Sequence, residues 1–388
     1  MPLDGLTDIN CKMSNQSVIS MLNSAAVHHA AQVVATRRAV VLTALKCYAD
    51  VFAPVIARLA NLSLQAGKFP ARYKTAQVLP LLKKPGLDSS SPANYRPVSN
   101  LSTVSKVLKH LVLTRLQTHL LGSNNFSQFQ SAYRKDHSTE MALLDVLDRA
   151  FTAAVNKHVS LLIGLDLSAA FNTVNHDLLL ACLQAEFGAS GTVLIWLQSY
   201  LDGHSLFVKI GQHQSTTTEL DTGIPHGSVL GPLLFAVYCS PVANIITAHS
   251  VPYYQYVVDT QLCLALHADN SAARLAVLAE CTTDVRQWYL QNGIQLSPDK
   301  SEVLIVGTSN QLRAVSSAVS SVADAGIDLS IADEMKVLRV KLDRWLTFDK
   351  HITMVARACN YHAHPSHTAS AHNQDRADVR LQSHPVQD

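Results

Sequence analysis

Hydrophobic residues recur along the chain with a helical period in several long segments. Steps of three and four residues over 101–121, 139–157 and 272–291 predict amphipathic helices, and similar spacing runs through the Ala-, Val- and Leu-rich stretch 17–66. Gly67 followed by Pro70 predicts the end of that first helical stretch, and Asn292-Gly293 predicts the end of the helix over 272–291. We also expect helices over 175–187 and 194–201.

Shorter apolar runs predict strands over 77–82, 159–167 and 301–306. The run 159–167 is apolar on both sides of a single acid, Asp166, as expected of a central strand buried on both faces. The stretch 251–266 predicts two strands joined by the two-residue turn Val257-Val258. Residues 308–332, rich in Ala, Ser and Val, are expected to form a linker or a helix.

Residues 227–248 carry no charge over 22 positions, which is long enough to span a bilayer. Glycine, proline and polar residues interrupt the stretch, so we favour a buried helix or strand of a soluble core and no membrane contact. The last 28 residues, 361–388, hold five histidines and one leucine, and we expect a disordered tail. The spacing His362-x-His364-x-x-His367 leaves metal binding there open.

The composition excludes several classes of protein. At 388 residues and 48% hydrophobic content, the chain is long enough for two or three domains and is not a mainly disordered protein. Seven scattered cysteines without a Cys-x-x-Cys pair argue against disulfide partners and zinc knuckles. Because residues 1–16 also lack the pattern of a signal peptide, we expect an intracellular protein, in the nucleus or the cytoplasm.

The net charge of +2 conceals two unlike parts. Residues 68–135 contain eleven Lys and Arg and a single acid, Asp88, so this segment carries +10 and the remainder −8. Such a basic segment is typical of a surface that binds phosphates. Solvated helix faces explain Lys106, Lys109 and Arg115, whereas Lys83, Lys84, Arg96 and Arg134 lie in loops, where phosphate contact is the better explanation.

Two acids are candidates for metal ligands. Asp166 interrupts a buried strand, where a carboxylate is costly unless it is paired or binds a cation, and Asp259 follows the tight turn at Val257-Val258. Carboxylates at strand ends and turns can converge on the divalent ions used in nucleotidyl transfer. Spacing alone does not separate this hypothesis from one acid capping a helix and the other lying in a turn.

The residues around these acids resemble motifs of a known family. Segments 165–176 (LDLSAAFNTVNH), 223–232 (GIPHGSVLGP) and 256–259 (YVVD) resemble motifs A, B and C of the reverse transcriptases of non-LTR, LINE-type retrotransposons. Segments 94–101 (NYRPVSNL) and 129–139 (FQSAYRKDHST) resemble its fingers motifs. The segment 288–293 (WYLQNG) with Lys300 resembles motif D, and 338–343 with 348–352 resembles the stretch that follows. The ordered likeness spans roughly residues 50–355.

The resemblance implies an α+β fold of the right-hand polymerase type, with fingers, a palm built on a ferredoxin-like antiparallel sheet, and a partial thumb. The implied domains are a helical N-terminal extension at 1–50, fingers at 51–158, the palm at 159–310, a partial thumb or connector at 311–360 and the tail at 361–388. The implied partners are an RNA template, a DNA primer and dNTPs.

The resemblance also implies roles for individual residues. Asp166 and Asp259 would be the catalytic and metal-ligating acids for Mg²⁺, and Lys300 would protonate the leaving pyrophosphate. Arg96 would bind the triphosphate and Phe171 would exclude a ribose 2′-OH. Nucleotide contacts are further implied for Arg134, His226 and Gly227, the last because a Cβ there would intrude on the nascent base pair.

Several positions depart from the family pattern. Motif C normally ends in two aspartates, and Val258 replaces the first of them, so a ligand expected beside Asp166 is missing. His226 stands where Gln is usual, Asn172 and Asn175 stand where acids are usual, and Arg339 replaces a Gly in the hairpin on the thumb side. The likeness ends after about residue 359, and we expect no endonuclease domain before residue 1.

We therefore expect a degenerate, truncated RNA-directed DNA polymerase, a nucleotidyltransferase with weak or lost Mg²⁺ binding and impaired or absent activity. The alternative is a non-catalytic nucleic-acid-binding relic of a retrotransposon. A third possibility is a relic that does not fold and has no molecular function.

Overall fold

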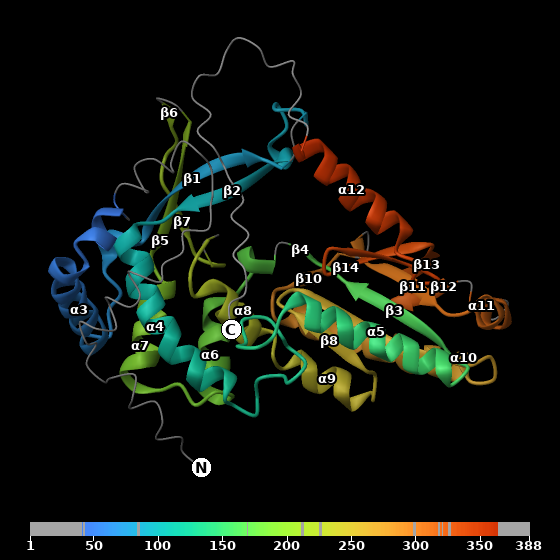
Figure 1. The fold of residues 1–388 in the computed structure, drawn as a ribbon. Helices are drawn as coiled ribbons and strands as arrows, with labels where there is room; N and C mark the ends of the chain where they lie inside the picture. Colours follow the sequence, from blue (N-terminus) through green and yellow to red (C-terminus); the bar gives the residue numbers. More distant parts are fainter. Residues whose placement is uncertain are drawn as a thin grey trace, which may run out of the picture.

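The computed structural model describes residues 41–363 apart from positions 42, 84–85, 169, 211–212, 225–226, 298–299, 317–318, 320 and 325–326 (Figure 1). The helices of this part are α3 Ala49–Gln65, α4 Thr103–Leu121, α5 Thr139–Val155, α6 His176–Ala185, α7 Gly191–Leu201, α8 Gly231–Tyr238, α9 Val242–Ala248, α10 Ser271–Gln291, α11 Ser309–Ser316 and α12 Asp349–Ala363. Most of the expected N-terminal extension 1–50 and of the histidine-rich tail 361–388 lies outside the described residues.

The strands form four sheets. Their bounds are β1 Thr75–Leu82, β2 Tyr95–Asn100, β3 Val159–Leu165, β4 Leu167–Ser168, β5 His204–Ile210, β6 His213–Gln214, β7 Thr218–Leu220, β8 Tyr253–Tyr256, β9 Asp259–Leu266, β10 Gln295–Leu296, β11 Glu302–Val306, β12 Ser321–Asp324, β13 Ile327–Ala332, β14 Glu334–Val337 and β15 Val340–Asp343. The largest sheet has the order β12-β13-β11-β3-β9-β8, and all its pairs are antiparallel except β11 with β13.

Strand β3 lies inside this six-stranded sheet because its side chains are apolar on both faces. Leu161, Ile163 and Leu165 point to one face and belong to a core shared with α6, α8, α9 and α10. Leu162 points to the other face, where α5 and the hairpin β14–β15 cover it. Figure 1 shows α5 lying across this side of the sheet. Burial on both sides explains why the sequence of β3 lacks the alternation of an exposed strand.

A second sheet, β2-β1-β5-β6 with β7 beside β5, stands next to α3, α4 and α7. β1 pairs antiparallel with β2 and parallel with β5. The expected end of the first helix is confirmed: α3 stops at Gln65, and Gly67 adopts a φ of +61°, which glycine tolerates at a helix C-terminus.

The expected helices and strands are largely confirmed, with one correction and several additions. The correction concerns 308–332, which we expected to be a linker or a helix: α11 is present, but β12 and β13 follow and extend the large sheet. Strands β2, β5 and β7 were not predicted. Most of their side chains are half-buried or exposed in a small sheet, so their sequences lack a clear apolar period.

The uncharged stretch 227–248 is part of the core, as expected. Its apolar portion, Gly231–Ala248, passes a length and hydropathy test for a membrane span, yet 67% of it is buried inside the protein. This portion forms two helices, α8 and α9, which are separated by a short turn at Ser240 and Pro241. Both helices pack against the large sheet. Among the described cysteines, Cys239, Cys263 and Cys281 are buried, whereas Cys47 and Cys359 are exposed.

The turn of the hairpin β14–β15 is strained. Its two central residues, Leu338 and Arg339, have φ values of +48° and +74°. Positive φ at both positions is the geometry of a type I′ turn, which favours Asn and Gly because a Cβ is crowded there. The sequence departure at Arg339 therefore falls on a position whose backbone suits glycine.

We expect Arg339→Gly to raise the free energy of unfolding by about 1 kcal/mol, because it removes the crowding of a Cβ at positive φ. Urea denaturation measures the change. The matched control is Val340→Gly, one residue further into β15, which should lower stability. Equal destabilisation by both substitutions would contradict the strain.

One basic residue has an unexpected place. Lys109, which the helical pattern of α4 assigned to a solvated face, is 0% exposed, and its Nζ has no hydrogen-bond partner. The ammonium lies 5.3 Å from the ring centres of both Phe69 and Tyr200. Burial, with a smaller effect of Lys106, lowers the pKa of Lys109 to about 8. The expectation was wrong because Phe69, which follows α3, and Tyr200 of α7 cover this side of α4.

We expect Lys109→Met to raise the free energy of unfolding at pH 7 by about 1–3 kcal/mol, because methionine fills similar space without a buried charge. Between about pH 8 and the ordinary lysine pKa of 10.5, the folded protein binds fewer protons than the unfolded chain. Wild-type stability therefore rises through this window relative to the variant.

Urea denaturation at pH 7 and pH 9.5 checks both points, since the gap between the two proteins should narrow at the higher pH. Lys83→Met, at an exposed lysine, is the control and should change little. A variant less stable than wild type at pH 7 would show that the ring contacts outweigh the cost of burying the charge.

Candidate active-site cleft

The two predicted acids meet at one end of the large sheet. Leu165 at the end of β3 pairs with Thr260 of β9, so the next residue on one strand, Asp166, lies beside the preceding residue on the other, Asp259. After Asp166 the chain forms β4, which pairs with β10. The backbone N–H of Ser297 donates to the carbonyl oxygen of Asp166 at 2.9 Å and holds the following segment against this strand end.

The charges at this strand end interact. Shielding from water raises the pKa of Asp259, the negative charge of Asp166 raises it further, and Lys336 opposes the shift. The Nζ of Lys300 lies 3.4 Å from Oδ2 of Asp166. The pair is half open to solvent, so its net contribution to stability is small. A cation placed between the two carboxylates would relieve their repulsion.

A cleft of about 1200 Å³ surrounds this pair. It brings together residues from distant parts of the sequence: Arg96, Asp166, Phe171, Val258, Asp259, Lys300, Lys336 and Arg339. The sheet with β2 supplies Arg96, the large sheet supplies the acids, and the hairpin β14–β15 supplies Lys336 and Arg339. A cleft lined by both cations and acids can hold a polyanion and a divalent ion at the same time.

The turn between β8 and β9 depends on a buried glutamine. Val257 has a φ of +58°, which is unfavourable for a β-branched residue. The backbone N–H of Val257 donates to Oε1 of Gln130 at 2.8 Å, and Nε2 of Gln130 donates to the carbonyl oxygen of Val257 at 3.4 Å. Gln130 is 2% exposed. The amide thus holds the turn that carries Val258 and Asp259.

The loop after β4 is held by the segment that resembles motif B. Gly223 has a φ of +80°, and a Cβ there would approach the carbonyl oxygen of Asn172 to 2.6 Å. Nε2 of His176 lies 2.8 Å from the carbonyl oxygen of Gly223. These contacts fix Phe171, whose ring centre lies 4.9 Å from that of Phe235. Asn175 caps α6 by accepting the N–H of Leu178, a role that aspartate also fills.

Three expected site residues do not line the cleft or are not described. Arg134 lies over the ring of Phe126 at 5.2 Å and donates to the carbonyl oxygen of Gln128 at 3.0 Å, so it holds its own loop. Gly227 has a φ of +76° and has only the carbonyl oxygen of Ser99 near its ideal Cβ, at 3.7 Å. A glycine is favoured at this position because of the positive φ and not because a Cβ would meet a close neighbour. His226 lies outside the described residues.

Some cleft residues were missed by the sequence analysis. Lys336 lines the cleft from β14, and Tyr133 lines it from the loop before α5, where burial raises the pKa of its phenol to about 12. Gln130 does not line the cleft but supports the turn through its two hydrogen bonds to Val257. Nothing in the pattern of the sequence distinguishes a buried amide from a surface one, although the segment 129–139 had been singled out by its resemblance.

Within the described part of the chain, no group of three or more His, Cys, Asp or Glu side chains is arranged to hold a metal ion. The cleft offers two neighbouring carboxylates, and at the adjacent turn position the half-buried Val258 packs against the core. Mg²⁺ is commonly bound by one or two carboxylates together with water and phosphate oxygens. The pair Asp166 and Asp259 therefore suits one such ion, whereas the third cleft carboxylate, Glu302, accepts the backbone N–H of Lys336 at 3.0 Å.

Comparison with known protein families decides the affiliation. Residues 82–342, more than half of the chain, match the family described as reverse transcriptase (RNA-dependent DNA polymerase). The chain belongs to the reverse transcriptase family. The match begins at the end of β1 and ends at β15, so it includes every strand of the six-stranded sheet and every cleft residue discussed above.

This reverse transcriptase sequence is similar to polymerases of non-LTR retrotransposons. It is 28% identical over 309 residues to a probable RNA-directed DNA polymerase from transposon BS of Drosophila melanogaster, covering 78% of this chain and 33% of that protein. It is 30% identical over 303 residues to the RNA-directed DNA polymerase from mobile element jockey of Drosophila funebris, covering 76% and 31%. The chain thus spans about a third of the length of these relatives.

Among solved structures, apo telomerase from Candida tropicalis, truncated from its C-terminal domain, aligns with a TM-score of 0.47 and 11% identity. The alignment covers 72% of this chain and 55% of the telomerase chain.

We expect Gln130→Leu to loosen the turn at Val257, because the substitution leaves the Val257 N–H without its partner, at a cost of about 1–3 kcal/mol. Hydrogen exchange over 253–260 should accelerate in the variant. Gln128→Leu, at an exposed glutamine two residues away, is the control and should leave this exchange unchanged. Unchanged exchange in both variants would show that the amide does not hold the turn.

Proposed function

We propose that the chain is the core of an RNA-directed DNA polymerase, with residues 51–158 as fingers, 159–310 as palm and 311–360 as partial thumb or connector. The adjacency of Asp166 and Asp259 at one end of the antiparallel sheet, inside a cleft lined with cations, carries this proposal. Family membership supports it independently. RNA template, DNA primer and dNTP are the proposed substrates, as the names of the relatives suggest.

The cleft residues take distinct roles in this proposal. Arg96 binds the triphosphate, since a guanidinium fork matches phosphate oxygens. Phe171, fixed by Phe235, occupies the space of a ribose 2′-OH and so favours dNTPs. Lys300, beside Asp166, gives a proton to the leaving pyrophosphate. Arg134 and Gly227 contribute less directly, through the loops that border the template and the nascent pair. For His226 a nucleotide contact is proposed from the resemblance alone.

Asp166 and Asp259 are the proposed ligands of Mg²⁺. When bound, the ion neutralises phosphate charge and makes the primer hydroxyl a better nucleophile. Burial is the main cause of the raised pKa of Asp259, and the proximity of Asp166 raises it further. That proximity of two negative charges supports the assignment, because it would also draw a divalent cation to the pair. Binding should weaken as the pH falls and Asp259 takes up a proton.

We further propose that polymerase activity is impaired. Val258 occupies the turn position next to Asp259 and offers no oxygen, so a catalytic divalent ion would keep one protein charge fewer than it needs. The same observation favours a second candidate function, a non-catalytic nucleic-acid binder. Such a binder keeps Arg96, Lys300 and Lys336 around the cleft and loses only the chemistry.

We expect Val258→Asp to raise primer extension on an RNA template by at least ~10-fold in Mg²⁺, because loss of even an outer-shell group costs a metal site that much or more. Val258→Asn is the control, since it matches the shape of aspartate without its charge. A second readout is thermal: the aspartate variant should be less stable without metal and gain more from added Mg²⁺ than wild type.

Wild-type extension equal to that of Val258→Asp would contradict the impairment. Extension absent from both proteins, together with RNA binding that weakens as salt rises, would favour the non-catalytic binder. Absence of both extension and salt-dependent RNA binding would overturn the proposed function.

A further inference from the structure

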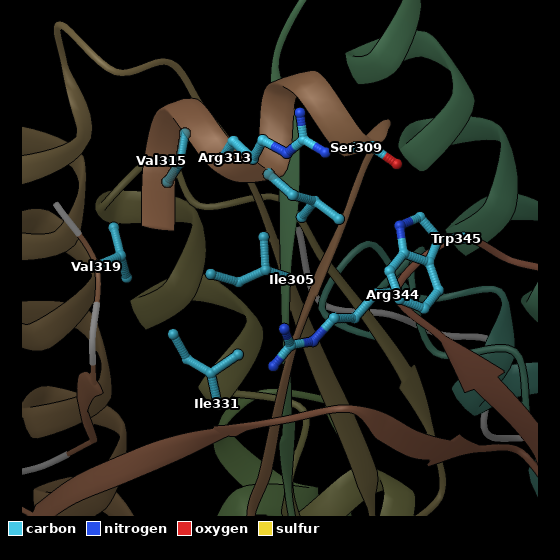
Figure 2. Close-up of a pocket in the computed structure, with 9 residues that line it drawn as sticks. Ile305, Ser309, Arg313, Val315, Val319, Ile331, Arg344 and Trp345 are labelled. Atoms are coloured by element: carbon cyan, nitrogen blue, oxygen red, sulfur yellow. The ribbon is translucent and has the colours of Figure 1, made fainter. Parts of the chain in front are cut away.

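A second hollow lies away from the cleft and shares no lining residue with it. Its volume is about 470 Å³, within the range of small-molecule sites. Strands β11 and β13, helix α11 and the segment after β15 form its walls (Figure 2). Its charged lining residues are Arg313 and Arg344, and its aromatic lining residue is Trp345.

The indole of Trp345 is presented to solvent by a rigid turn. Its side chain is 60% exposed, whereas Trp196, in the core, is 2% exposed. Asp343 accepts the backbone N–H groups of Trp345, Thr347 and Phe348 at 2.9–3.1 Å. The carbonyl oxygen of Arg344 accepts the N–H of Gly307 at 3.1 Å, which ties the turn to the end of β11. Little conformational entropy is therefore lost when a ligand stacks on the ring.

Arg344 carries an unused donor. Its Nε is buried and has no hydrogen-bond partner, while Nη2 pairs with Asp333 at 2.9 Å. A buried donor without a partner costs free energy, so an acceptor supplied by a ligand would be favoured there. Figure 2 shows the Arg344 side chain running from the base of Trp345 toward Ile331, with Arg313 above it on α11.

Apart from Ser309, the rest of the lining is apolar. Ile305, Leu312, Val315 and Ile331 form the wall between the two arginines. A ligand that matches this set needs a flat ring for the indole, an apolar edge for the wall and an anionic group for the guanidinium groups. A nucleotide has all three, and an exposed aromatic ring beside arginines is the usual means of binding single-stranded nucleic acid.

The pocket is also placed to receive a strand that leaves the cleft. Lys336, Leu338 and Arg339 of the hairpin β14–β15 line the cleft, and Arg344 and Trp345 follow directly after β15. The distance along the four residues of β15 is about 13 Å at the usual rise of a strand. One hairpin therefore connects the two hollows.

We propose that this pocket is a second binding site for single-stranded nucleic acid, in which a base stacks on Trp345 and the adjoining phosphate contacts Arg344 and Arg313. Binding at this site does not require catalysis, so the proposal holds whether or not the chain is an active polymerase as in the proposed function. The flat indole and the arginine forks favour a nucleotide over an acidic peptide, which supplies charge without a ring.

Tryptophan fluorescence of the full chain, titrated with a 12-nucleotide oligouridylate RNA or oligothymidylate DNA, tests the site. Binding should quench Trp345, which is the exposed one of three tryptophans. Anisotropy of the labelled oligonucleotide gives the affinity separately. We expect Trp345→Ala to weaken binding roughly fivefold or more and Trp345→Phe to retain most of it. Arg313→Ala should lower the salt slope by about one.

Two controls separate the pocket from other surfaces. Phe151→Ala removes an exposed aromatic ring from α5 and should change affinity less than twofold. Arg96→Ala alters the cleft and should leave the quenching of Trp345 in place, so failure of the cleft to bind is distinguishable from failure of the pocket.

Binding of either oligonucleotide that depends on Trp345 supports the site, and the ratio of the two affinities shows whether a ribose is preferred. Equal affinities of Trp345→Ala and Phe151→Ala would overturn the proposal. Equal quenching by an oligoglutamate peptide would also overturn it, because the site would then select charge alone.

Discussion

The cleft depends on the antiparallel pairing of β3 with β9. This register places Leu165 opposite Thr260, and it thereby sets Asp166 beside Asp259 at the end of a sheet that is buried on both faces. A slip of one residue would turn the apolar side chains of β3 to the wrong faces, so core packing and site geometry are specified together. The energetic cost of two neighbouring carboxylates is met by the burial of the leucines and isoleucines behind them.

The turn that carries Asp259 is less stable by itself than the strands it joins. Val257 adopts a conformation that opposes its branched side chain, and Gln130 compensates with two hydrogen bonds from a loop far away in the sequence. Strain at a site of this kind persists only where surrounding contacts determine the geometry. A similar strain occurs at Arg339, which lines the same cleft from the hairpin β14–β15.

Changes in charge at this site have little effect on the fold. Val258 packs against the core, and Asn175 caps α6 as aspartate would, so neither substitution removes a contact that the framework needs. Under the proposed function, the framework and the chemistry can therefore diverge, because the packing of the sheet does not depend on a carboxylate at position 258. In the proposed function and the further inference, the arginines and lysines around the cleft and the Trp345 pocket form the surface that binds nucleic acid.

The sequence by itself determined the long elements and the two central acids. The helices at 101–121 and 272–291, the buried strand before Asp166 and the two-residue turn at Val257 all follow from local periodicity, because apolar spacing reflects which face of an element is buried. Only the tertiary structure decided the burial of Lys109, the hydrogen bonds of Gln130 to the turn at Val257, the strands β12 and β13 and the pocket at Trp345. Each of these depends on residues brought together across long stretches of chain, and local periodicity carries no information about such partners.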